Sequence, residues 1–202
     1  MLKDDIKAKN IRRVIHFTRI ENLNKILQEG LRPRDELSTG EYIYNDEHRI
    51  DGYTNAVCCS ICYPNYKMFY KLRMEDPTAE WVIIGIKTKV LWKKDVAFCF
   101  DNAASSDIIT LPLEVLKGSE AFLKMFEEYD NKPSRHAMGL PDCYPTNPQA
   151  EVLVFDTIDP KDIFGLVFET QERKDEYKKR FPDLQMLGNK KYFSARHDYD
   201  HW

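Results

Sequence analysis

The sequence predicts an α+β protein, and two observations carry that prediction. Short apolar runs that fit strands are mixed irregularly with a few amphipathic segments that fit helices. The chain also lacks the regular strand–helix alternation and the G-x-G-x-x-G signature of a doubly wound nucleotide-binding fold. Its 202 residues suit a single domain over residues 1–202, with enough chain to build a core without disulfides.

Apolar runs locate the strands, and apolar residues at helical spacing locate the helices. We predict strands at 11–17, 55–63, 80–91, 96–100, 151–155, 163–168 and 190–193. We predict helices at 18–31, 65–74, 112–129 (in one or two pieces) and 171–181. Two polar segments, 32–56 and 130–150, are long loops of the kind that often carry function.

The predicted helix at 18–31 has a signal at each end. Thr18 and Glu21 match the T-x-x-E capping box, in which the two side chains satisfy backbone N–H groups of the first turn. Gly30 stands where a helix C-terminal glycine belongs.

The charge and targeting signals exclude several classes of protein. Thirty basic residues against 33 acidic ones give a net charge of −3, so a nucleic-acid site has to come from a local patch. The charged N-terminal segment lacks the apolar region of a signal peptide, and no run is long enough to span a membrane. We therefore expect a cytoplasmic protein with reduced cysteines and no membrane partner.

The cysteines and the C-terminal histidines do not predict a metal site. Cys59 and Cys62 form a C-x-x-C pair, but a structural zinc site needs about four ligands and no second such pair exists. The surrounding residues indicate a buried strand, where cysteine is a small core residue. His197 and His201 belong to a terminal segment that we expect to be exposed or docked.

Basic residues form local clusters, and aromatic residues accompany one of them. The clusters are Lys7, Lys9, Arg12 and Arg13; Lys67, Lys71 and Arg73; and Lys87, Lys89, Lys93 and Lys94. Aromatic and basic side chains together can stack bases and hold phosphates. The alternative is a set of solvated faces beside ordinary core aromatics, and composition alone favours that alternative.

Two pairs of polar residues lie beside predicted strands. Gln149 and Glu151 precede an apolar run, and on a strand they would share one face. His16 and Thr18 lie at a strand-to-helix junction, a common place for ligand groups. Taken alone, these residues also fit a core histidine, a helix cap and a carboxylate that caps a strand.

Several motifs together resemble the DarT family, ADP-ribosyltransferase toxins that modify bases in single-stranded DNA. VIHFTRIENLNKILQEGL (14–31) is similar to that family's opening, and YPNYKMFY (63–70) is loosely similar to its S-P-M-L-Y-type segment. QAEVLV (149–154) closely resembles its Q-A-E-hydrophobic motif. The resemblance spans about residues 11–170, and FDNAASSDIIT (100–110) departs from it by lacking a histidine that some members have.

The resemblance implies an ADP-ribosyltransferase-like fold, with a central split mixed β-sheet, flanking helices, NAD as substrate and no metal. Glu151 matches the family's catalytic glutamate. Such a carboxylate would stabilise the oxocarbenium-like transition state formed when nicotinamide leaves the ribose. Arg49 matches a catalytic arginine, and because a guanidinium is not a base, it would stabilise a deprotonated base or the pyrophosphate.

The remaining roles that the resemblance implies concern NAD and the acceptor. His16 and Thr18 would hold the nicotinamide half of NAD. Asn22 and the helix end at Gly30 would lie near the NAD cleft. The acceptor would be a base in single-stranded DNA, with thymine first and guanine second. The residues expected to contact the nucleic acid are Tyr66, Lys67, Lys71, Arg135, Tyr144 and Asn147.

A DNA modification of this kind would block replication, so we expect a toxin with a cognate macrodomain antitoxin. Two alternatives stay open. The same core could serve an NAD-dependent RNA 2′-phosphotransferase or a transferase that modifies RNA or protein, although the Q-A-E motif argues against the phosphotransferase. The chain could also be a non-catalytic nucleic-acid-binding module.

Overall fold

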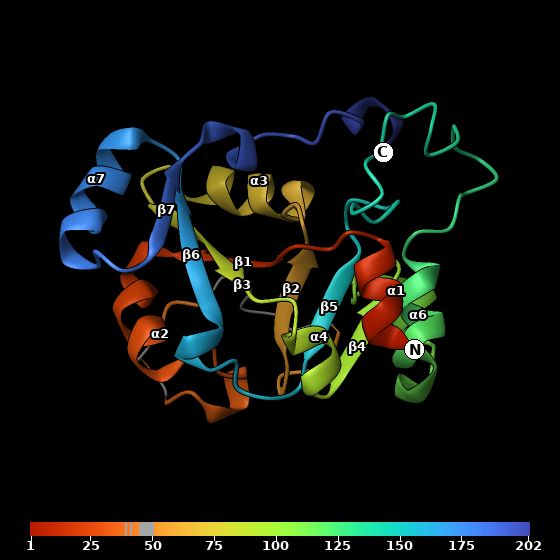
Figure 1. The fold of residues 1–202 in the computed structure, drawn as a ribbon, viewed down its shortest axis with the longest axis horizontal. Helices are drawn as coiled ribbons and strands as arrows, with labels where there is room; N and C mark the ends of the chain where they lie inside the picture. Colours follow the sequence, from red (N-terminus) through yellow and green to blue (C-terminus); the bar gives the residue numbers. More distant parts are fainter. Residues whose placement is uncertain (39, 41, 45–50) are drawn as a thin grey trace.

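The computed structural model describes residues 1–38, 40, 42–44 and 51–202. In this part of the chain, seven strands form one sheet in the order β4-β5-β2-β1-β3-β6-β7 (Figure 1). Neighbouring strands are antiparallel, except that β6 and β7 are parallel. The sheet is mixed and helices flank it, so the predicted α+β class is confirmed.

The elements have the following bounds. The strands are β1 (Val14–Arg19), β2 (Val57–Ile61), β3 (Trp81–Ile86), β4 (Val96–Cys99), β5 (Glu151–Val154), β6 (Ile163–Phe168) and β7 (Gln185–Gly188). The α-helices are α1 (Leu2–Ala8), α2 (Leu23–Glu29), α3 (Tyr66–Glu75), α4 (Val90–Lys93), α5 (Ser106–Ile109), α6 (Gly118–Lys124) and α7 (Gln171–Arg180). Short 3₁₀ helices lie at Ile20–Asn22, Arg34–Glu36, Leu113–Leu116, Pro160–Asp162, Lys190–Phe193 and Tyr199–His201.

The capping box predicted from Thr18 and Glu21 is wrong. Thr18 lies inside β1, where it pairs with Val82 of β3, and a 3₁₀ turn separates β1 from α2. β1 pairs with β3 along all of its residues, and this pairing extends the backbone through the position that would have capped the helix. Gly30 does end α2, with a φ of +91°.

Two more differences concern the ends of the chain. The strand predicted at 190–193 is a 3₁₀ turn, because the Asn189 side chain accepts a hydrogen bond from the Lys191 N–H and caps it. The last strand is β7, which precedes that turn and was not predicted. Helix α1 was also not predicted. The segment 112–129 is helical in two pieces, separated at the extended residue Lys117, and the second piece begins at Gly118, whose φ is +81°.

The central strands are buried, and the helices lie around them. All of β3 and all of β5 are buried. α1 and α6 pack together beside β4, and α7 packs beside β7 at the opposite edge (Figure 1). Every helix in the described residues is too short or too polar to cross a membrane.

The sheet is split between β1 and β2. These strands pair at Val14 with Ile61 and at Ile15 with Ser60, and within the described residues the ladder goes no further. β1 stays paired with β3 on its other side, and β2 stays paired with β5. The split predicted for the sheet therefore lies where His16 and the residues after it leave β2.

Candidate active site

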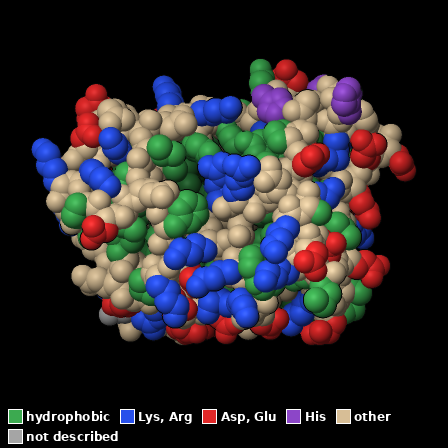
Figure 2. All heavy atoms as spheres, viewed as in Figure 1, with side chains coloured by type: hydrophobic (Ala, Val, Ile, Leu, Met, Phe, Trp, Pro, Cys, Tyr) green, Lys and Arg blue, Asp and Glu red, His purple; other side chains and the backbone are tan. Residues whose placement is uncertain are grey.

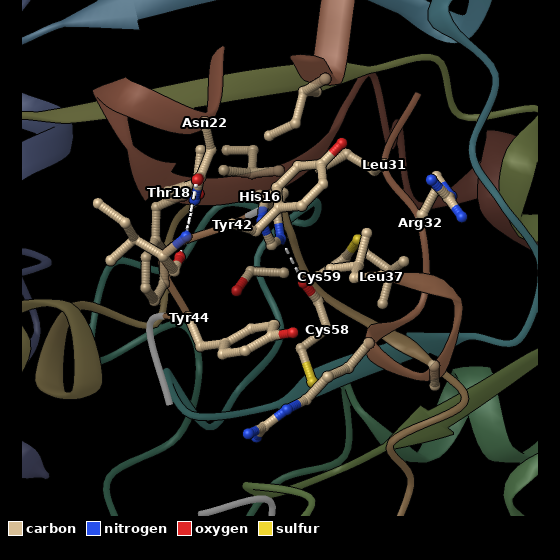
Figure 3. A pocket seen from close by; sticks show the side chains of 18 of the residues that line it. His16, Thr18, Asn22, Leu31, Arg32, Leu37, Tyr42, Tyr44, Cys58 and Cys59 are labelled. Atoms are coloured by element: carbon tan, nitrogen blue, oxygen red, sulfur yellow. Dashed lines mark hydrogen bonds between the residues drawn. The ribbon is translucent and has the colours of Figure 1, made fainter. Parts of the chain in front are cut away.

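The separation of β1 from β2 forms a pocket. Its walls come from β1, α2, β2 and the described residues of 31–44 (Figure 3). The empty space between its walls is about 970 Å³, which includes the solvent-filled space at its open mouth. The walls are mainly apolar. The polar and charged residues that line them include His16, Thr18, Asn22, Arg32, Arg34, Tyr42, Tyr44, Ser60 and Glu151.

Glu151 is the carboxylate of this pocket. It is the first residue of β5 and is only 6% exposed. Asn102 Nδ2 donates to its Oε1 at 3.2 Å, and the Ala103 backbone N–H donates to its Oε2 at 3.0 Å. Asn65 Nδ2 makes a longer contact with Oε1 at 3.5 Å. A buried carboxylate that accepts hydrogen bonds is held in one orientation and is stabilised as the anion.

His16 reaches across the split. Its Nδ1 lies 2.8 Å from the backbone oxygen of Cys58 on β2. Because a carbonyl oxygen can only accept, Nδ1 carries a proton and donates it. This bond fixes the imidazole between the two halves of the sheet, where Figure 3 shows it in the pocket.

Thr18 and Asn22 form the next part of the wall. Asn22 Nδ2 donates to Thr18 Oγ1 at 3.1 Å and to the Ile43 carbonyl oxygen at 2.8 Å, and its Oδ1 accepts from the Ile43 N–H at 3.0 Å. The Asn22 amide therefore ties the backbone of Ile43, in the loop after α2, to the start of α2. Its contribution to the pocket comes from holding this loop in place.

The chain that forms this pocket matches one protein family over most of its length. The family model described as "ssDNA thymidine ADP-ribosyltransferase, DarT" matches residues 15–199. The chain belongs to the DarT family. The family is one of ADP-ribosyltransferases. No curated protein matches the chain.

Solved DarT structures share the fold. Thermosipho africanus DarTG in complex with ADP-ribose has a TM-score of 0.65 and 16% identity, over 90% of this chain and 51% of that one. The present chain thus spans about half of the Thermosipho protein. Thermus sp. 2.9 DarT in complex with carba-NAD⁺ has a TM-score of 0.57 and 16% identity, over 91% of this chain and 98% of that one.

A third structure, Thermus sp. 2.9 DarT in complex with ADP-ribosylated ssDNA, has a TM-score of 0.57 and 15% identity, over 92% of this chain and 97% of that one. At these identities the likeness concerns the fold. The expected ADP-ribosyltransferase-like fold is confirmed.

Most of the residues predicted for the NAD site of this DarT family member lie together in the structure. His16, Thr18, Asn22 and Glu151 line one pocket. Gly30 does not line it, although the two residues after it do. Gly30 instead allows close packing, because a Cβ there would lie 2.4 Å from the Ile158 carbonyl oxygen. Arg49 lies outside the described residues.

Gln149 does not share a strand face with Glu151, so that expectation is wrong. The Asn147 side chain accepts from the Gln149 N–H at 2.9 Å, and the Asn147 carbonyl accepts from the Ala150 N–H at 3.1 Å. These bonds close a turn immediately before β5, so the two-residue periodicity of a strand does not apply there. Gln149 is half-buried and does not line the pocket.

The residues predicted to contact nucleic acid fall into two groups. Tyr66, Lys67 and Lys71 lie on α3. Tyr66 is buried, and its hydroxyl has no hydrogen-bond partner among the described residues. Lys67 is half-buried, and Lys71 is exposed and lies 3.8 Å from Glu75.

The second group holds the 130–150 loop together. Arg135 donates to Thr146 Oγ1 at 2.7 Å and to a second loop oxygen at 3.0 Å. Asn147 Nδ2 donates to Asp101 Oδ1 at 2.8 Å. Tyr144 packs its ring at 5.6 Å from that of Tyr63. Arg135 and Asn147 therefore have internal partners, which the sequence did not indicate.

The basic cluster at 87–94 lies away from the pocket. Figure 2 shows Lys and Arg side chains gathered over α4 and the neighbouring start of β6. Lys89 lies 2.5 Å from Asp162, and Lys94 lies 3.9 Å from Asp159. Neighbouring acids therefore offset part of this charge.

Sequence reasoning missed the residues that hold Glu151, and it missed the pocket-lining residues that follow α2, such as Tyr44. Asn65 is the N-cap of α3, and its side chain accepts from the Met68 N–H at 3.2 Å while also contacting Glu151. Arg34 lies over the ring of Tyr44, with 4.3 Å to the centroid. The one available signal was that Asn65, a residue type that often caps helices, stands at the start of the predicted helix.

The cysteines show no sign of a metal centre. Among the described residues, no group of three or more His, Cys, Asp or Glu side chains could hold a metal ion. The five cysteines form no disulfide with one another. A hydrogen bond with Cys62 and, to a smaller extent, the nearby Arg13 charge lower the pKa of Cys143 to about 6, against the effect of burial. Burial raises the pKa of Cys59, and the charge of Glu151 adds to the increase.

Proposed function

We propose that this protein transfers ADP-ribose from NAD to thymine in single-stranded DNA, with Glu151 as the catalytic carboxylate. One observation supports the assignment of Glu151 most directly. A buried carboxylate, held by Asn102 and the Ala103 N–H, lines an open pocket in the split of the sheet. The choice of thymine as acceptor rests on the description of the family, not on the pocket.

The residues around the pocket fit the chemistry of NAD. Its aromatic and aliphatic walls suit the flat rings of a dinucleotide. The polar side chains of His16 and Thr18 would serve the carboxamide of the nicotinamide. Arg32 and Arg34 line the same pocket and provide positive charge for the pyrophosphate. His16 and Thr18 come from β1 at the split of the sheet, and the two arginines come from the segment that follows α2.

The reaction breaks the bond between the nicotinamide nitrogen and the ribose C1′, and it forms a bond from C1′ to a ring nitrogen of the acceptor. Nicotinamide leaves with the bonding electron pair, and the acceptor nitrogen loses its proton. The positive charge that develops on the ribose is stabilised by the Glu151 carboxylate. The same carboxylate can bind a ribose hydroxyl or take up the acceptor proton. Its hydrogen bonds fix its direction before the substrate arrives, which limits the reorganisation that catalysis requires.

The acceptor is proposed to be single-stranded because a base inside a duplex is buried and would have to be flipped out. The family description names ssDNA thymidine, and the Thermus relative was solved with ADP-ribosylated ssDNA. Guanine is the second candidate. A net charge of −3 also suits a short contact with a few nucleotides better than a non-specific grip on a duplex.

We further propose that the activity makes the protein toxic and that a macrodomain antitoxin reverses the modification. The Thermosipho relative carries the name DarTG, which supports a paired partner. The proposed location is the cytoplasm, where NAD and replicating DNA are both present.

The test of the proposed function combines an acceptor panel with one substitution. Labelled NAD is incubated with the protein and matched oligonucleotides of single-stranded DNA, duplex DNA and RNA, or with protein extract. We expect label on thymine-containing single strands alone. Equal labelling of duplex DNA, or labelling only of RNA or protein, would contradict the proposed acceptor and leave the transferase class intact.

Glu151→Gln should lower the transfer rate by about 10²–10³-fold or more while the protein stays folded and binds NAD, since the side chain keeps its shape and loses its charge. Glu176→Gln is the matched control, because Glu176 is an exposed residue of α7 that pairs with Arg173. A Glu151→Gln variant that keeps more than about a tenth of the wild-type rate would remove Glu151 from the catalytic role.

A further inference from the structure

The segment 194–202 lies along the loop 130–150 (Figure 1). His197 Nε2 lies 3.1 Å from the carbonyl oxygens of both Met138 and Gly139. Lys132 donates to the His201 carbonyl oxygen at 2.6 Å, and the ring of Trp202 packs edge-on against that of Tyr129. This segment is therefore docked, and its contacts reach both ends of the loop.

Arg196 is the centre of this contact. It is only 2% exposed. Its Nη1 donates to the Pro145 carbonyl oxygen at 2.8 Å, and its Nη2 donates to the Thr146 carbonyl oxygen at 2.7 Å. Buried carbonyl oxygens need donors, and the planar guanidinium serves both of them from one side.

Asp198 holds the Arg196 guanidinium in place. Its two carboxylate oxygens accept from Arg196 Nε at 2.6 Å and from Nη2 at 2.7 Å, and Oδ2 also accepts from the Trp202 indole at 2.9 Å. Burial alone would raise the pKa of Asp198, but the hydrogen bond and charge of Arg196 outweigh burial and lower it. The pair is thus ionised, buried and hydrogen-bonded, which is the condition for a buried ion pair to fix a conformation.

The carbonyl groups that Arg196 holds are close in sequence to Glu151. Thr146 is fully buried and is held from two further sides, by its N–H bond to the Met125 carbonyl oxygen at 2.9 Å and by Arg135. From Thr146 the chain runs through the turn at Asn147 directly into β5. A change in the position of Thr146 would therefore alter the path of the loop beside the catalytic carboxylate.

The docked segment is separate from the NAD pocket. Among the described residues, none in 194–202 and none in 130–150 lines that pocket. Loosening the segment should therefore change the loop without removing any contact to NAD. This separation distinguishes a positioning role from a general effect on the fold.

We propose that Arg196 is a positioning residue for the acceptor. By holding Pro145 and Thr146, it keeps the loop 130–150 in the conformation that receives the nucleotide to be modified. This inference rests on the proposed transfer to DNA. Arg196 does not line the NAD pocket, so the proposal gives it no part in the chemical step.

The first test measures transfer to a thymine-containing single-stranded oligonucleotide by the full chain. Arg196→Ala is expected to raise the KM for the oligonucleotide at least tenfold and to leave the affinity for carba-NAD⁺ within about twofold of wild type. Arg196→Lys should give an intermediate KM, because one ammonium group cannot serve two carbonyls and a carboxylate with the geometry of the fork. Arg173→Ala, which removes an exposed arginine of α7, is the matched control and should change neither quantity.

A second variant covers the case in which Arg196→Ala fails to fold because Asp198 is left without its partner. Arg196→Met combined with Asp198→Asn removes the fork and leaves no unpaired charge, while the Asn oxygen can still accept from Trp202. Amide hydrogen exchange should then rise in 130–150 and stay unchanged in 14–19 and 57–61.

The outcomes separate the two proposals. A parallel loss of carba-NAD⁺ affinity, or faster exchange in 130–150 with an unchanged KM for the oligonucleotide, would overturn the positioning role. If wild-type protein labels no oligonucleotide, the proposed acceptor fails. Unchanged exchange in 130–150 would overturn the anchoring by Arg196, whatever the acceptor is.

Discussion

Replacing Asn102 by Ala should slow ADP-ribosyl transfer about 10- to 100-fold and leave the KM for NAD nearly unchanged. Asn102 donates to Glu151 Oε1 at 3.2 Å, but it does not line the NAD pocket. The substitution therefore keeps the carboxylate and the pocket walls, and it removes one of the groups that orient the carboxylate.

The magnitude follows from the hydrogen bond that is lost. A hydrogen bond to a charged group contributes about 1.5–3 kcal/mol net, and about 1.4 kcal/mol corresponds to a tenfold change in rate. If this contribution is expressed in the transition state, the loss is about tenfold to somewhat above a hundredfold. The Ala103 N–H at 3.0 Å still holds Oε2, so we expect the loss to stay below that of Glu151→Gln.

The assay is steady-state transfer from labelled NAD to a single-stranded oligonucleotide, with kcat and both KM values measured. Asn102 also accepts from the Ala104 N–H at 2.9 Å, so a thermal melt is needed to show that the variant is folded at the assay temperature. Asn24→Ala is the matched control, because Asn24 is exposed and bonds to Arg180 on α7. A rate within about threefold of wild type, or an effect confined to the KM for NAD, would refute the orienting role.

Two further predictions concern stability and thiol chemistry. Gly30→Ala should lower the Tm by about 3–10 °C. The strain of the added Cβ is roughly 1–3 kcal/mol, and each kcal/mol corresponds to about 2–4 °C in a chain of this size. Gly118→Ala is the control: Gly118 also has a positive φ, but a Cβ there meets nothing within 4 Å, so the Tm should fall less in the same melting experiment. Iodoacetamide should alkylate Cys143 at pH 7 and leave Cys59 unmodified, because the hydrogen bond from Cys62 lowers the pKa of Cys143 to about 6 and burial raises that of Cys59. The Cys143 rate should fall as the pH drops below about 6, and a rate that rises only above pH 8 would contradict this assignment.

The parts of the site that lie within one strand could be predicted from the sequence. Periodicity placed His16 and Thr18 on one side of a strand and Glu151 at the start of another, and the resemblance to the DarT family then selected them as site residues. The structure places all three at one pocket.

What could not be predicted depends on contacts between distant segments. Asn102 and Ala103 hold Glu151 from a position 49 and 48 residues earlier in the chain, and no local pattern marks them. The Thr18 cap failed for the same reason, because pairing with β3 decides where β1 ends. Arg196 lies in a segment that looked like a tail, and only its contacts with Pro145 and Thr146 reveal its importance.

The short ladder between β1 and β2 gives this protein a sheet edge in its interior. An edge strand is normally a site where another extended chain can add. Here residues of β1 and β2 on both sides of the split line the pocket, so a molecule bound there lies between the two halves of the sheet. NAD would then join the two halves of the sheet while it is bound. The enzyme should therefore be most rigid when loaded and should loosen along this seam each time nicotinamide and the product depart.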